Sequence, residues 1–308
     1  MKAFIPSTDA QRLVVLADVP EPKTAPDEAV VEVAAFSVNR GETFLLERPS
    51  QDWRPGKDIA GTVLRAAADG SGPAVAERVV AHPSSAGWAE RVAVKTAQIA
   101  TLPDTVSEVV AAALPLAGLT ALRLLRVTGP LASRRVLMTG ASGGVGHFFT
   151  ELAAMGGAEV TVVTGSPERG ARLRELGAAH VVHDVADAEA PFDVVLESVG
   201  GTSLQAGLVK LRPRGALIWF GQASRVAPSI DFFRFWEGPA SGTIRHFHYT
   251  DSDVLDGRDL QTLVQFVASG RLHPEIGLVS DWENTDQVLR TLRDRGVRGN
   301  AVLTRTVR

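Results

Sequence analysis

The sequence predicts an α/β protein of two domains, and three observations support this fold class. The chain has 308 residues, a length that suits two domains. From residue 135 onward, short apolar strands alternate with helical segments, as in a parallel sheet covered by helices on both faces. The first hundred residues hold β-branched segments separated by Gly, Pro, Ser and Asp, a pattern typical of a small β domain.

The elements of the β domain come from both ends of the sequence. Strands are expected at residues 30–36, 59–64, 78–81 and 89–94, followed by helices at 108–113 and 118–126. Further strands at 275–279 and 301–304, around a helix at 285–295, indicate that the last part of the chain rejoins the first domain. We therefore expect one domain of residues 1–115 and 272–308, and a second of residues 116–271.

The second domain is expected to contain a doubly wound parallel sheet. Its strands are predicted at residues 136–138, 159–164, 181–183, 193–197, 216–220 and 243–249. Its helices are predicted at residues 145–155, 169–176, 203–211 and 258–268.

A glycine-rich turn joins the first predicted strand of this domain to its first helix. Residues 136–146 read VLMTGASGGVG, and Ala141, Gly143 and Gly146 match the dinucleotide fingerprint, with Ala at its first glycine position. The fingerprint requires a strand before the turn, a helix after it and a second strand beyond the helix, and the sequence predicts all three. This turn predicts a Rossmann domain whose dinucleotide diphosphate is bound at Ser142, Gly143, Gly144, Val145 and Gly146.

Composition excludes several other classes. The net charge of −3 offers no surface for nucleic acid or anionic membrane, and no apolar run is long enough to span a bilayer. The absence of Cys excludes disulfides and Cys-ligated zinc. His246 and His248 alternate on a predicted strand but lack a third ligand nearby, so no metal site is expected. The first residues lack the apolar core of a signal peptide, and we expect a cytoplasmic protein.

Several ordered motifs resemble one known family. VNRG at residues 38–41, PGKDIAG at 55–61, AAALPLAGLTA at 111–121 and ESVGG at 197–201 resemble motifs of the quinone oxidoreductases in the medium-chain dehydrogenase/reductase superfamily. The short-chain dehydrogenases share the glycine-rich turn, but their Tyr-x-x-x-Lys acid is missing here, because Asp253 follows the only tyrosine, Tyr249, after four residues. Zinc-dependent alcohol dehydrogenases have a Cys where this chain has Asn39, and a His in the segment that matches residues 56–58.

The resemblance implies a GroES-like β domain beside the Rossmann domain, and a homodimer. It implies reduction of a quinone or an α,β-unsaturated carbonyl with NADPH, without zinc. Asn39 and Thr120 then resemble positions lining the nicotinamide and are the candidate catalytic residues; packing roles in a loop and a helix are the alternative. Further candidate cofactor contacts are Ser198, Val199, Phe220, Gly221, Thr243, Ile244, Arg245 and Asn300, the last where the family has Lys.

The preference for NADPH follows from the residues after the second strand. An acid there would bind the ribose hydroxyls of NAD, whereas a cation or hydroxyl suits the 2′-phosphate of NADP. The segment offers Thr164, Gly165, Ser166 and Arg169, with no acid at the strand end, and His183 replaces a Tyr that often flanks the adenosine. The alternatives are a solvated Arg169 paired with Glu168 or Glu175, and a His183 that merely lies on the surface.

Two other functions remain open from the sequence. One is reduction of an enoyl thioester in a biosynthetic pathway, and the other is a catalytically idle NADPH-binding protein on the same scaffold. The residues do not identify the electrophilic small-molecule substrate. The expected substrate loop contains no Tyr, Cys or His, so we expect Asn39 or a cofactor hydroxyl to hold the substrate oxygen and water to supply the proton.

Overall fold

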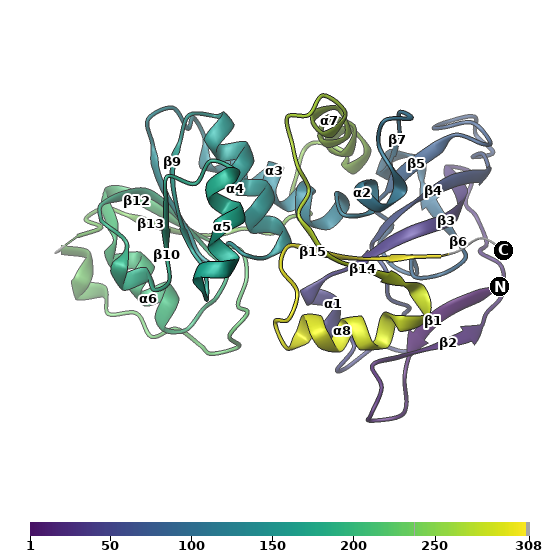
Figure 1. Cartoon of the computed structure of the whole chain (residues 1–308), viewed down its shortest axis with the longest axis horizontal. Coiled ribbons are helices and arrows are strands. Elements are labelled where there is room, and N and C mark those ends of the chain that lie inside the picture. Colours follow the sequence, from purple (N-terminus) through teal and green to yellow (C-terminus); the bar gives the residue numbers. More distant parts are fainter. Residues whose placement is uncertain (237, 306–308) are drawn as a thin grey trace. The chain divides into compact units, whose positions relative to one another are not determined.

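The computed structural model describes residues 1–236 and 238–305, which divide into two compact units. Unit 1 comprises Met1–Leu119 and the chain from Asp253 onward, and unit 2 comprises Thr120–Ser252 (Figure 1). The sequence-based boundary at residue 272 left α7 (Asp256–Ala268) outside the β domain. In the structure this helix packs on strand β7 (Ile99–Thr101) of unit 1, where Gly257 permits close approach to the Ile99 carbonyl.

Unit 2 contains a six-stranded parallel sheet of order β10-β9-β8-β11-β12-β13. The strands are β8 (Arg135–Met138), β9 (Glu159–Val163), β10 (His180–Val182), β11 (Phe192–Glu197), β12 (Leu211–Trp219) and β13 (Thr243–His246). The helices are α4 (Gly144–Met155), α5 (Pro167–Glu175) and α6 (Thr202–Val209), the 3₁₀ turns are η2 (Val185–Asp187) and η3 (Phe232–Trp236), and α3 (Pro115–Thr128) leads into the unit.

The strands in the middle of this sheet are apolar on both faces because helices cover both sides. Val136, Leu137 and Met138 of β8 are all buried, as are Val195 and Leu196 of β11. Counted along the chain, the strand order is 3-2-1-4-5-6, and the winding reverses between β8 and β11. A ligand of such a sheet binds at this point, beyond the carboxyl ends of the strands. The predicted Rossmann fold is confirmed.

Unit 1 is built on a mostly antiparallel sheet of order β14-β15-β3-β4-β5-β7, with β6 paired to β3 and only β14–β15 parallel. Its strands are β3 (Glu28–Val38), β4 (Asp58–Arg65), β5 (Arg78–Ala81), β6 (Arg91–Lys95), β7 (Ile99–Thr101), β14 (Ile276–Asp281) and β15 (Asn300–Thr304). Unit 1 also contains a hairpin of β1 (Lys2–Pro6) and β2 (Val14–Asp18). Its other elements are the helices α1 (Arg40–Leu45), α2 (Glu108–Ala112) and α8 (Thr285–Arg293) and the 3₁₀ turns η1 (Thr96–Gln98) and η4 (Trp282–Asn284). This is the predicted GroES-like β domain.

Aromatic side chains fill the core of unit 1. The ring of the fully buried Trp88 stacks on Phe36 with centroids 5.9 Å apart, and Phe4 meets Trp282 edge-on at 5.7 Å. The indole Nε1 of Trp88 donates to the carbonyl of Ser37 at 3.0 Å, which satisfies its buried N–H.

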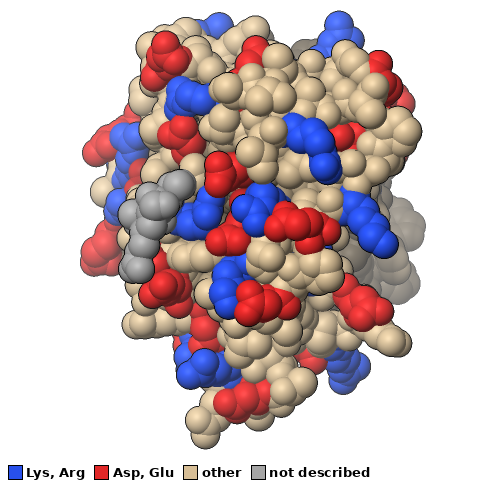
Figure 2. Space-filling view, turned by 90° about the vertical axis from the view of Figure 1, so that its right-hand side faces the viewer, with Lys and Arg blue, Asp and Glu red and all other residues tan. Residues whose placement is uncertain are grey.

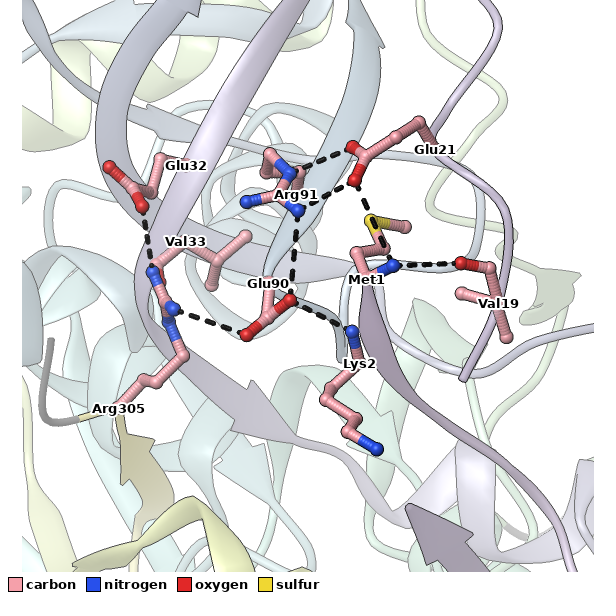
Figure 3. Close-up of polar contacts among 9 residues, drawn as sticks. All are labelled: Met1, Lys2, Val19, Glu21, Glu32, Val33, Glu90, Arg91 and Arg305. Atoms are coloured by element: carbon pink, nitrogen blue, oxygen red, sulfur yellow. Dashed lines mark hydrogen bonds and ion pairs between the residues drawn. The ribbon is translucent and has the colours of Figure 1, made fainter. Parts of the chain in front are cut away.

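A network of ion pairs joins residues of β3 and β6 to the segment after β15 (Figure 3). Arg91 makes two hydrogen bonds to Glu21, at 2.6 and 2.8 Å, and also lies 3.7 Å from Glu90. Arg305, just after β15, pairs with Glu90 and Glu32. Because Arg305 is largely buried and also donates to the carbonyl of Val33 at 3.0 Å, it fixes the end of β15 on β3.

On the face shown in Figure 2, the Lys and Arg side chains are interleaved with Asp and Glu and form no continuous patch of one sign among the described residues. In residues 1–236 and 238–305, no helix is both long and apolar enough to cross a membrane.

Candidate cofactor site and buried carboxylate cluster

The glycine-rich turn of unit 2 leads directly from β8 into α4. Gly140 has a φ of +63°, which glycine adopts without strain, and Gly143 is the N-cap residue of α4. No side chain caps this helix start, and Ser142, Gly143, Gly144 and Val145 are half-buried. The first-turn N–H groups therefore present an anion site that a cofactor diphosphate fits.

Close packing between the turn and its helix depends on Gly146. A Cβ at this position would lie 2.2 Å from the carbonyl oxygen of Ala141 and 2.4 Å from its Cα. This glycine therefore acts through helix–strand packing, the role of the third glycine of the fingerprint.

A buried carboxylate holds the ends of β8 and β11 together beside the turn. Glu197 accepts hydrogen bonds from Thr139 Oγ1 at 3.0 Å, Ser203 Oγ at 2.9 Å, and the backbone N–H groups of Val199 and Gly200. Ser198 donates from its backbone N to Thr139 Oγ1 and from its hydroxyl to the Thr139 carbonyl. The structure thus fixes the backbone of the predicted contacts Ser198 and Val199 at the carboxyl end of β11.

The predicted phosphate site lies at the end of β9 and the start of α5. Thr164 Oγ1 donates to the Ser166 carbonyl at 2.9 Å, and the exposed His183 brings Nδ1 to 3.2 Å from the Thr164 carbonyl. Arg169 is half-buried in the first turn of α5. A hydrogen bond from the Ser166 side chain lowers the pKa of the exposed Glu168, with a smaller contribution from nearby His183. The Glu168 carboxylate, which the sequence offered as an alternative partner of Arg169, therefore lies beside the residues predicted to bind the 2′-phosphate.

The remaining predicted contacts of unit 2 differ in their position along the sheet. Phe220 follows β12 and donates its backbone N–H to the carbonyl of Glu197 at 2.9 Å, so it lies with Gly221 at the carboxyl edge. The segment Thr243–Arg245 lies within β13, whose register pairs Thr243 with Ala216 and His246 with Trp219. His246, rather than Thr243, is therefore level with the carboxyl end of β12.

In unit 1, the predicted active-site residue Asn39 belongs to a buried polar cluster. Asp58 is fully buried and accepts hydrogen bonds on both carboxylate oxygens. Its Oδ2 accepts from Ser37 Oγ and Asn39 Nδ2, each at 2.6 Å. Its Oδ1 accepts from the Leu116 backbone N–H at 2.9 Å and lies 3.2 Å from Nδ1 of His82.

A second buried acid, Glu42, lies beside this cluster. Its Oε2 accepts from the backbone N–H of Asn39 at 3.0 Å, and its Oε1 accepts from that of Gly56 at 2.9 Å. Burial and the nearby Asp58 carboxylate raise the pKa of Glu42 to about 8. The cluster was not predicted from the sequence, although Glu42 directly follows the VNRG motif and Asp58 lies in PGKDIAG.

The other two predicted contacts are buried elsewhere. Asn300 opens β15, and its Nδ2 donates to the Glu275 carbonyl at 3.1 Å, so this amide already has a structural partner. Thr120 is buried in α3. Within the described residues, no group of three or more His, Cys, Asp or Glu side chains is arranged to hold a metal ion.

Comparison with known proteins agrees with this fold. The family described as zinc-binding dehydrogenase matches residues 144–269. The quinone oxidoreductase of Coxiella burnetii has a TM-score of 0.87 at 22% identity, covering 100% of this chain and 99% of that one. The Escherichia coli quinone oxidoreductase, solved in complex with NADPH, has a TM-score of 0.87 at 20% identity, covering 98% and 99%.

A third similarity is to a much longer protein. The spectinabilin polyketide synthase system protein NorB of Streptomyces orinoci is 32% identical over 312 residues, which cover 94% of this chain and 14% of that protein. The chain spans between 14% and 65% of the first three curated relatives' own lengths.

The fold of both units matches that of these solved quinone oxidoreductases. The chain is therefore similar in fold to quinone oxidoreductases of the medium-chain dehydrogenase/reductase superfamily, the family that its sequence motifs resemble.

Proposed function

We propose that this protein is an NADPH-dependent reductase that transfers a hydride to a quinone or an α,β-unsaturated carbonyl compound. The observation that carries the proposal is the uncapped, glycine-lined start of α4 at the point where the winding of the parallel sheet reverses. The NADPH in the related Escherichia coli structure supports the choice of cofactor.

In this proposal the bound NADPH supplies the hydride, and the protein supplies binding and orientation. The N–H groups of Gly144 and Val145 hold the diphosphate, and Ser166 and Arg169 hold the 2′-phosphate. Asn39 donates an amide hydrogen bond to the substrate oxygen as negative charge develops there. A neutral amide does not release a proton, so water delivers the proton that completes the reduction.

A substrate panel tests the proposed function. Oxidation of NADPH is followed with quinones, enones and enoyl thioesters at matched concentrations. Turnover of quinones or enones supports the proposal. A strict preference for enoyl thioesters would favour the second candidate, an enoyl-thioester reductase, which the similarity to the polyketide synthase protein supports. Tight NADPH binding without oxidation in any reaction would instead indicate a catalytically idle binding protein.

Arg169→Ala is expected to weaken NADPH binding by about tenfold to a hundredfold and to leave NADH binding nearly unchanged. The reason is that one charge-assisted hydrogen bond to the 2′-phosphate contributes about 1.5–3 kcal/mol. Isothermal titration of both cofactors measures the effect. Arg172→Ala is the matched control, because it removes the same charge from the same helix while Arg172 pairs with Glu175 at 2.8 Å. Equal losses for NADPH and NADH would contradict the assignment.

A further inference from the structure

We propose that Asp58 is a positioning residue whose buried carboxylate fixes the amide of Asn39 and the imidazole of His82 in one orientation each. The inference rests on the proposed function for its catalytic consequence, but the orientations themselves follow from the hydrogen bonds of unit 1.

The four groups around Asp58 come from three separate segments of unit 1, since Ser37 and Asn39 are only two residues apart. Ser37 lies near the end of β3, Asn39 is the N-cap residue of α1, His82 directly follows β5, and Leu116 lies in the first turn of α3. The register of β3 and β4 pairs Ser37 with Asp58, so the carboxylate lies where these segments meet. Burying a carboxylate away from water is costly unless several donors satisfy it, and here four polar groups lie around its two oxygens.

The carboxylate decides which way the amide of Asn39 faces. A carboxylate accepts hydrogen bonds and donates none, so the amide nitrogen must face it. Rotating the amide by half a turn would place Asn39 Oδ1 against Asp58 Oδ2, in the position from which Asn39 Nδ2 now donates at 2.6 Å. One hydrogen of Nδ2 is therefore committed to Asp58, and the other is held in a single direction as the donor that Asn39 offers to a ligand.

The same argument fixes the tautomer of His82. Its Nδ1 lies 2.8 Å from the Lys57 carbonyl oxygen and 3.2 Å from Asp58 Oδ1. Both neighbours are acceptors, so Nδ1 carries a hydrogen and Nε2 is the nitrogen without a hydrogen in the neutral ring. A buried carboxylate that holds Nδ1–H in this way sets ring orientation, as the Asp does for the His in a catalytic triad.

A double-mutant cycle tests whether Asp58 acts through Asn39. We expect Asp58→Asn to lower kcat by about tenfold to a hundredfold, as misplacement of an orienting group does, with unchanged affinity for NADPH. We expect Asn39→Ala to lower kcat, and the double variant to lose little more than the larger single loss. Asp69→Asn is the matched control, because Asp69 is an exposed acid of the same unit and should leave kcat unchanged. Multiplicative losses in the double variant, or a folded Asp58→Asn with the kcat of the wild type, would overturn the proposal.

A measurement on the unaltered protein keeps the inference testable if Asp58→Asn does not fold. The ring nitrogens of ¹⁵N-labelled His82 report the tautomer directly, and the proposal requires hydrogen on Nδ1 in the neutral ring. Hydrogen on Nε2 alone would overturn it. This readout also separates the two proposals, since a wild type that reduces no substrate but shows the Nδ1–H tautomer would contradict the proposed function and retain the orientation by Asp58.

Discussion

Gly146→Ala is expected to destabilise unit 2 by about 1–3 kcal/mol, the usual cost of overpacking. In an ordinary helix interior this substitution would stabilise the protein by about 1 kcal/mol. Here the added Cβ would meet three backbone atoms of Ala141 at 2.2–2.5 Å, so the turn and the helix must move apart. The same movement should weaken NADPH binding, because it displaces the first N–H groups of α4.

Urea unfolding and cofactor titration measure both effects. Gly165→Ala is the control for the urea measurement alone, because a Cβ there meets nothing within 4 Å and lies at the neighbouring strand end. Equal stability of Gly146→Ala and the wild type would show that the close approach in the turn is not required.

The free energy of unfolding of unit 1 is expected to fall as the pH rises, and Glu42→Gln should make this fall much smaller. The pKa of Glu42 is raised from 4.5 to about 8, so between these values the native state binds a proton that the unfolded state releases. The free energy of unfolding therefore falls as the pH rises through this window, by on the order of a few kcal/mol. The neutral Gln has no such dependence, although it forfeits one of the two backbone hydrogen bonds.

Unfolding free energies of the wild type and Glu42→Gln, measured from pH 5 to about 8.5, test this expectation. The variant should be less stable at the acid end and should gain on the wild type as the pH rises. Glu47→Gln is the control, since Glu47 is an exposed acid in the loop after α1. Parallel pH curves for Glu42→Gln and the wild type would show that Glu42 is ionised throughout.

Much of the fold was predictable because its signals are local. The alternation of apolar strands and helices fixed unit 2, and every strand predicted there occurs in the sheet, although β13 ends at His246 and not at residue 249. The hairpin β1–β2, the short strand β7 and helix α1 were not predicted. Lys2–Pro6 and Ile99–Thr101 are short, and Ile99–Thr101 pairs with β5, from which it is separated in the sequence by β6.

The candidate site, like the fold, has one part that was predictable from the sequence and one part that was not. The glycine-rich turn was predictable, because one continuous segment supplies its glycines, strand and helix. Ser37, Asp58 and His82 are distant in sequence, and a single buried polar residue leaves no periodic trace. Only the register of β3 with β4, and of β4 with β5, brings them together. The position of Thr243 along the sheet also depends on strand register, here that of β13 with β12. A strand predicted from sequence does not show which of its residues will be level with the end of β12.

The discontinuous course of unit 1 has a consequence for biosynthesis. Strand β15 pairs with β3 along Ala301–Thr304, and β14 extends the same sheet, yet both leave the ribosome after the whole of unit 2. Unit 2 is continuous and has its complete parallel sheet as soon as Ser252 has emerged. We therefore expect unit 2 to fold during translation, while β3 keeps an unpaired edge until β15 arrives. Nascent chains stalled before residue 300 should be the species most dependent on chaperones.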